Sequence, residues 1–178
     1  MSSPLELDFS MTGAGWAGLT VRKGGRSHEI ESFSYLSDAL DDLVRLGIDI
    51  ATDRSFGWAR FLHEPGSTIL FAESGWWAGA TDWVAGYRLS TISSRDYGES
   101  EPEWNRLHRT EREFMVELET RDELPNAILE AARRIESDLG TEGYAKRWTG
   151  RLGFPSRAVA ALRAALATPS LPAEPWRS

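Results

Sequence analysis

The sequence predicts an α+β fold, with a mainly antiparallel sheet of about six strands and two or three helices packed on one face. Segments that alternate apolar and polar residues are separated by short turns rich in glycine and proline, which is typical of antiparallel strands. Elsewhere apolar residues recur every three or four positions, as in amphipathic helices. The 178 residues suit one domain, which we expect to span residues 1–167.

The strands are predicted from this alternation. A glycine turn at residues 13–15 and a Glu-Pro-Gly-Ser turn at residues 64–67 each indicate a hairpin. Residues 74–81, rich in glycine and tryptophan, and residues 93–110, which are polar, are expected to be loops. In chain order the predicted strands are residues 5–11, 17–22, 57–63, 68–73, 82–92 and 113–119, and residues 26–33 can form a further short strand after the second.

Helices are predicted over residues 36–46, 122–139 and 156–167, with a further short one at residues 141–149. Gly140 is expected to end the second helix. Three prolines predict a loosely ordered tail over residues 168–178. Residues that can cap the helices stand before them: Ser34 or Ser37, Asp122, and Ser156.

Composition excludes several classes of protein. The net charge of −7 opposes binding to nucleic acid, and no apolar run approaches the length of a membrane span. The N-terminus lacks the basic and apolar regions of a secretory signal. Because the chain contains no cysteine, thiolate chemistry is excluded and a cytoplasmic location is expected.

The segment Gly13-Ala14-Gly15-Trp16-Ala17-Gly18 matches the G-x-G-x-x-G pattern of dinucleotide-binding folds. That site needs a helix directly after the glycines, because the helix N-terminus holds the pyrophosphate. Here the following residues alternate as a strand and soon reach another turn. We therefore predict a hairpin turn and no nucleotide cofactor.

The three histidines, His28, His63 and His108, are isolated and form none of the paired patterns of metal sites on helices. His63 beside Glu64, or His108 near Glu111, can serve as a general base, although a surface histidine is the commoner alternative. The chain also lacks a nucleophile elbow and a phosphate-binding loop. We expect no metal, no cofactor and, on balance, no enzymatic activity.

Four carboxylates, Glu111, Glu113, Glu117 and Glu119, are predicted to line one face of the last strand. A row of this kind is more often a solvated sheet face. It can also hold a hard metal, do acid–base work, or form a surface for a basic partner.

Aromatic residues gather in the middle of the chain. On a glycine-flanked loop they favour a binding patch, because they offer large contact area at low entropy cost; the alternative is a loop that covers the core. Trp16 and Trp58, which lie on strands, are predicted to be core residues. The predicted binding residues are Trp76, Trp77, Asp82, Trp83, Tyr97 and Trp104, with Glu113 and Glu117 from the last strand.

A group of small bacterial proteins, common in actinobacteria, has a pattern that resembles three segments of this chain. The segments are Gly13-Ala14-Gly15-Trp16-Ala17, Ser34-Tyr35-Leu36-Ser37-Asp38-Ala39-Leu40-Asp41-Asp42-Leu43 and Glu64-Pro65-Gly66. The resemblance covers about the first 70 residues, with a looser likeness at residues 122–139. No activity is established for that group, so the resemblance implies a bacterial origin and no mechanism.

These observations favour a small acidic binding protein without catalysis, such as an immunity or inhibitor protein that blocks a basic partner. The negative surface would steer the partner and the aromatic loop would anchor it. The alternative is a small-molecule-binding or enzymatic domain with a pocket between sheet and helices, lined by Trp83, Tyr87 and Trp104. A third hypothesis is an assembly subunit that uses the C-terminal helix and tail.

Overall fold

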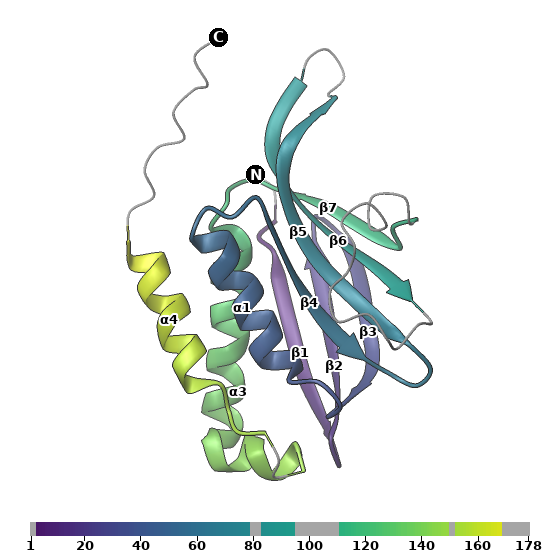
Figure 1. Cartoon of the computed structure of the whole chain (residues 1–178), viewed down its shortest axis with the longest axis vertical. Coiled ribbons are helices and arrows are strands. Elements are labelled where there is room, and N and C mark those ends of the chain that lie inside the picture. The colour runs from purple at the N-terminus through teal and green to yellow at the C-terminus, as the bar shows by residue number, and fades with distance from the viewer. Residues whose placement is uncertain (1–2, 79–82, 95–110, 150–151, 169–178) are drawn as a thin grey trace.

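Strands and helices follow one another in two blocks, each of which begins with strands and ends with helix (Figure 1). The computed structural model describes residues 3–78, 83–94, 111–149 and 152–168. In these residues the elements are β1 (Glu6–Gly13), β2 (Trp16–Lys23), β3 (Arg26–Ser34), α1 (Ala39–Ala51), β4 (Phe56–Leu62), β5 (Ser67–Ala78), β6 (Trp83–Ser94), β7 (Phe114–Leu118), α3 (Glu123–Arg147) and α4 (Ser156–Ala167).

The seven described strands form two antiparallel sheets, β1-β2-β3 and β4-β5-β6-β7. The α+β class and the antiparallel pairing are confirmed, whereas the prediction of one sheet with about six strands is wrong. β3 does not pair with β4 as neighbouring strands of one sheet. Its side chains instead form hydrogen bonds with residues of the second sheet. Arg26 Nη1 donates to the carbonyl of Met115 at 2.5 Å, and His28 Nε2 lies 3.1 Å from Thr91 Oγ1.

A bulge in β3 accounts for this separation. The pairing of β2 with β3 shifts register between Ala17 and Leu19, and Ser32 has a φ of 52°. A bulged strand bends and twists more strongly than its partner, so β3 can leave the plane of its own sheet.

One hydrophobic core joins both sheets to the helices, which lie together on one side of the strands in Figure 1. α1 supplies its centre, with Leu40, Leu43, Leu46 and Ile50 fully buried. This packing confirms that a helix following the third strand covers the strands. No helix in the described ranges is long and apolar enough to cross a membrane.

The glycine motif is a hairpin turn, as predicted. Gly13, Ala14 and Gly15 all have positive φ between β1 and β2. A Cβ on Gly15 would lie 2.5 Å from Cδ1 of Tyr35, and the Gly15 N–H donates to the Arg147 carbonyl at 2.9 Å. The turn is therefore packed against the protein, and its backbone is engaged with α3 instead of open to a phosphate.

The helix ends differ in detail from the prediction. α1 begins three residues later than predicted, and its cap is Asp38 rather than Ser34 or Ser37: Asp38 Oδ1 accepts from the Asp41 N–H at 3.3 Å. Asp122 and Pro155 precede α3 and α4 without a side-chain capping bond. Gly140, at φ 65° and ψ 170°, interrupts the helical backbone of α3 where the sequence predicts a stop.

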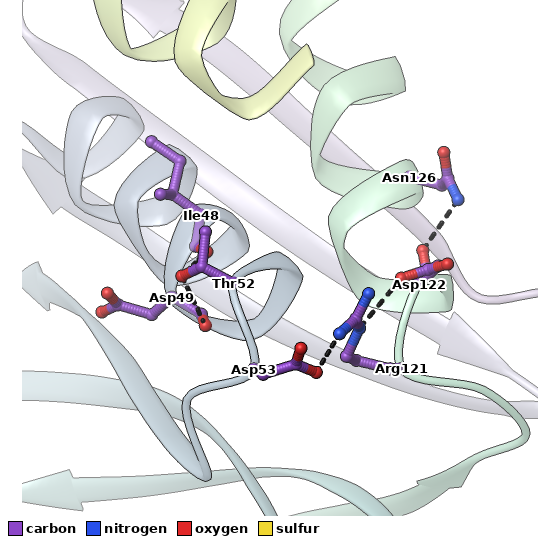
Figure 2. A network of polar contacts seen from close by, with 7 residues as sticks. All are labelled: Ile48, Asp49, Thr52, Asp53, Arg121, Asp122 and Asn126. Atoms are coloured by element: carbon purple, nitrogen blue, oxygen red, sulfur yellow. Dashed lines mark hydrogen bonds and ion pairs between the residues drawn. The ribbon is translucent and has the colours of Figure 1, made fainter. Parts of the chain in front are cut away.

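A polar clamp holds the end of α1 against the start of α3 (Figure 2). The Arg121 side chain, 11% exposed, is ion-paired with Asp53, and its Nε donates to Asp122 Oδ1 at 3.2 Å. Asn126 Nδ2 donates to the Asp122 carbonyl at 2.8 Å, and Thr52 Oγ1 closes α1 by donating to the Ile48 carbonyl at the same distance. Because the Arg121 guanidinium is already bound by Asp53 and Asp122 between the two helices, we regard the network as structural.

β5 and β6 extend beyond the other strands of their sheet as a two-stranded arm (Figure 1). Pairing with β4 ends at Glu73, and pairing with β7 begins at Tyr87, whereas β5 and β6 remain paired as far as Ala78 and Trp83. The expected loop at residues 74–81 is therefore a strand up to residue 78. We call residues 75–78 and 83–86 the β-arm.

Candidate functional site

A polar pocket of about 370 Å³ lies between β3 and the end of the second sheet where β5 begins and β6 ends. Its walls come from β3, the β4–β5 turn, β5, β6 and the residue preceding β7. The residues that line it are Trp16, His28, Glu29, Ile30, Glu31, Ser32, His63, Glu64, Thr68, Ser93 and Glu113.

Local structure brings these side chains together. The bulge at Ser32 bends β3 where it forms one wall. The hairpin turn is closed by the His63 N–H, which donates to the Gly66 carbonyl at 3.0 Å, and this places His63 beside the start of β5. Thr68 and Ser93 are register partners on β5 and β6, so their hydroxyls meet at 3.1 Å.

A chain of hydrogen bonds runs along the pocket. His63 Nε2 lies 3.1 Å from Thr68 Oγ1, and Ser93 Oγ donates to Glu113 Oε2 at 2.9 Å. Together with the contact between the two hydroxyls, these bonds connect an imidazole to a carboxylate through Thr68, which is buried, and Ser93.

The pocket is electronegative. Four of its lining residues are glutamates, Glu29, Glu31, Glu64 and Glu113, and none of the described lining residues is lysine or arginine. Burial lowers the pKa of His28, while the nearby Glu113 acts in the opposite direction and raises it. Since the burial effect is the larger one, His28 favours the neutral form, so it adds little positive charge to the described walls of the pocket at neutral pH.

Trp16 adds an aromatic surface to the pocket. It is half-buried and lines the wall, in contrast to the prediction that it is a core residue. The face of an indole attracts cations, which suits a site that already carries negative charge. Trp58 is also half-buried; it packs against Phe71 in a separate apolar cluster, on the face of the second sheet opposite the main core.

The structure separates the two predicted carboxylate ligands. Glu113 lines the pocket and accepts from Ser93, whereas Glu117 Oε1 accepts from Arg88 Nη2 at 3.1 Å. The strand alternation breaks where β7 begins, because Arg112 turns to the opposite face and pairs with the buried Glu73 at 2.6 Å. Glu111, Glu113, Glu117 and Glu119 therefore do not act as one row.

Three of the predicted aromatic residues belong to the ends of β5 and β6 opposite the pocket. Trp76 and Trp77 are on β5 and Trp83 is on β6, in the β-arm. Trp76 is the register partner of Ala85, and Trp83 is the register partner of Ala78. Three further predicted residues, Asp82, Tyr97 and Trp104, lie outside the described residues.

Sequence reasoning found part of this site. It singled out His63, Glu64 and Glu113, but it assigned them to separate features and treated His28 as isolated. It missed Thr68 and Ser93, because a lone hydroxyl residue on a strand carries no signal. The expected pocket between sheet and helices is not this one: Tyr87 is not among the described residues that line it.

A larger cavity of about 640 Å³ lies between α1 and the start of α4. Its charges are mixed, since Asp41, Arg45 and Arg157 line it together, and Arg45 Nε already donates to Asp41 Oδ2 at 2.5 Å. The smaller pocket has both the uniform charge and the hydrogen-bonded chain, so we take it as the candidate site.

Within the described ranges, no group of three or more histidine, aspartate and glutamate side chains is arranged to hold a metal ion. Comparison of the chain with protein-family models, with curated proteins and with solved structures found no match. The pocket's own chemistry is therefore the basis for a function.

Proposed function

We propose that this protein is a small acidic binding protein without catalytic activity, and that its pocket accepts a positively charged group of a partner. The observation that carries the proposal is the set of four glutamates lining a pocket with no lysine or arginine among its described walls. A cationic side chain entering the pocket would meet carboxylates on several sides and the indole of Trp16.

A basic protein is the partner that this chemistry favours. The net charge of −7 accelerates encounter with a basic surface, and one inserted arginine or lysine side chain would then fix the register of the complex. The β-arm supports the same proposal, because it projects from the sheet and carries Trp76, Trp77 and Trp83. Tryptophan and arginine are the residues most enriched among binding hot spots. An inhibitor or immunity protein is a concrete form of this function.

A small cationic molecule is the second candidate. The volume of about 370 Å³ falls within the roughly 300–1,000 Å³ range of small-ligand sites. The two candidates share one chemistry, a guanidinium or ammonium group, and differ in whether the rest of the ligand reaches beyond the pocket.

The test is calorimetric titration with a blocked Gly-Arg-Gly peptide, which presents a single guanidinium group. We expect saturable binding that weakens with salt, because screening reduces attraction between exposed charges. Changing Glu29, Glu31 and Glu113 together to glutamine keeps the size of the side chains and should weaken binding at least 10-fold. Free agmatine, titrated in parallel, distinguishes a small-molecule site if it binds more tightly than the peptide.

A charge-matched control removes three carboxylates elsewhere. Glu130, Glu136 and Glu142 are exposed on α3, which contributes no residue to the pocket. Their replacement by glutamine should leave peptide affinity within about 2-fold of the wild type. Equal loss of affinity in both variants would show that the peptide binds the overall negative charge, and the proposed site would be wrong.

A further inference from the structure

The direction of the hydrogen-bonded chain in the pocket follows from its donors and acceptors. A hydroxyl has one proton to donate. Ser93 donates its proton to Glu113, so Thr68 must donate to Ser93. The Thr68 proton is then used, and His63 must donate to Thr68 from Nε2.

This direction links the charge of His63 to that of Glu113. An ionised Glu113 makes its bond with Ser93 charge-assisted, and a protonated His63 does the same at the other end. Hydrogen bonds in a chain polarise one another in the same direction. The chain therefore couples the charge at Glu113 to the charge at His63, so a cation bound at one end alters the hydrogen bonding at the other.

His28 is the second imidazole that faces the pocket. Its Nε2 lies 3.1 Å from Thr91 Oγ1, and its ring stacks on Phe114 with 5.3 Å between centroids. The guanidinium of Arg26 lies 5.4 Å from the centroid of the same Phe114 ring. The charge of Glu113 raises the pKa of His28, against the larger lowering by burial, and Glu113 also ends the hydrogen-bonded chain that begins at His63.

We propose that protons on His28 and His63 compete with the ligand cation for the carboxylates of the pocket, so that binding releases protons and weakens on acidification. The charged groups around the two imidazoles are Glu29, Glu31 and Arg26 from β3, Glu64 from the β4–β5 turn, and Glu113 before β7. At acid pH the imidazolium groups supply the positive charge that the carboxylates require. At neutral pH they lose it, and an external guanidinium or ammonium takes its place.

The expected effect follows from linkage. If the bound cation weakens proton binding to the imidazoles, bound protons weaken cation binding by the same factor, because coupling between two ligands is reciprocal. One imidazole with an ordinary pKa near 6.5 that must be neutral in the complex lowers affinity by roughly 10-fold between pH 7.5 and pH 5.5. The lowered pKa of His28 moves its share of this effect to lower pH, so we expect a fall of about 10-fold for the wild type.

The proposal rests on the proposed function, and its test uses the same blocked Gly-Arg-Gly peptide at pH 5.5, 6.5 and 7.5. Titration in buffers with different heats of ionisation counts the protons released. The wild type should release a net fraction of a proton or more at pH 6.5.

Three variants locate the effect. His28→Gln with His63→Gln should bind with nearly equal affinity at pH 5.5 and 7.5. Thr68→Val keeps both histidines and all four glutamates but breaks the chain, so it should reduce proton release without abolishing binding. This variant separates coupling through the chain from simple proximity of charges.

The outcomes distinguish the two proposals. If the peptide binds the wild type equally well at pH 5.5 and pH 7.5, without proton release, competition by the imidazoles is wrong and the proposed function stands. If the double histidine variant keeps the wild-type pH dependence, the inference is again wrong. If the peptide does not bind at any pH, both proposals fail together. Because the proton count is made on the wild type, it does not depend on how well a variant folds.

Discussion

Replacing Asp42 with asparagine should stabilise the protein at neutral pH. Asp42 lies in the first turn of α1, where the helix dipole favours a negative charge. Burial, the largest cause, nevertheless acts with the neighbouring Asp38 and Asp41 to raise its pKa from 3.8 to about 6, against the lowering effect of Arg45 and Arg60. The ionised form is thus disfavoured in the folded protein relative to the unfolded chain.

The size and sign of the effect follow from this pKa. At 1.36 kcal/mol per unit, the rise corresponds to about 3 kcal/mol. Part of the Asp42 carboxyl is exposed, so solvent screening reduces the expected gain to ~1–2 kcal/mol. A raised pKa contributes stability that is present below pH 3.8 and is lost as pH rises through about 6. The gain from asparagine should therefore be large at pH 7.5 and close to zero near pH 4.

Urea unfolding of both proteins at pH 4.0 and pH 7.5 measures this difference. Asp41→Asn is the matched control, because it removes the same charge from the same helical turn but breaks the ion pair with Arg45, at 2.5 Å. It should be neutral or cost about 0.5 kcal/mol. A destabilised Asp42→Asn protein at pH 7.5, or an equal gain at both pH values, would refute the reasoning.

Three further changes test the packing. Leu43→Ala should cost ~2–5 kcal/mol in urea unfolding, because Leu43 is fully buried beneath the strands; a cost under about 1 kcal/mol would make α1 peripheral. Lys23→Met should cost ~3 kcal/mol by the same measurement, because it leaves the largely buried Glu123 without its cation, and a neutral result would contradict burial of the pair. Trp76→Ala with Trp77→Ala should leave the unfolding free energy within about 1 kcal/mol, because the two strands of the β-arm pair only with each other among the described residues; unfolding of this variant would place the tryptophans in the core.

Local patterns predicted most of the secondary structure. The alternation of apolar and polar residues, together with the turn residues, predicted the positions of β1 to β4 and β7 closely. The recurrence of apolar residues every three or four positions predicted α1, α3 and α4. The hairpin turn at Gly13–Gly15 was predictable because strand alternation on both sides leaves no room for a helix. These features depend on neighbouring residues alone, so a sequence is sufficient to find them.

Element ends were predicted less well. Asp38, rather than a serine, caps α1, because several adjacent residues can accept the same first-turn N–H and packing selects one. β5 continues through Trp76 and Trp77, although glycine and tryptophan favoured a loop there. Pairing with β6 supplies backbone hydrogen bonds to this segment, and a prediction from neighbouring residues alone does not take these bonds into account.

The sequence by itself determined the composition of this protein's site: an acidic chain without cysteine, with His63 and Glu64 at a turn and Glu113 at a strand end. Only the tertiary structure decided which of these residues meet. The division into two sheets, and the bulge that bends β3, bring His28 opposite Glu113. Strand pairing between residues far apart in the chain places Thr68 against Ser93 and so completes the path from imidazole to carboxylate. Such pairing depends on the whole core being buried at once, and no local pattern encodes it.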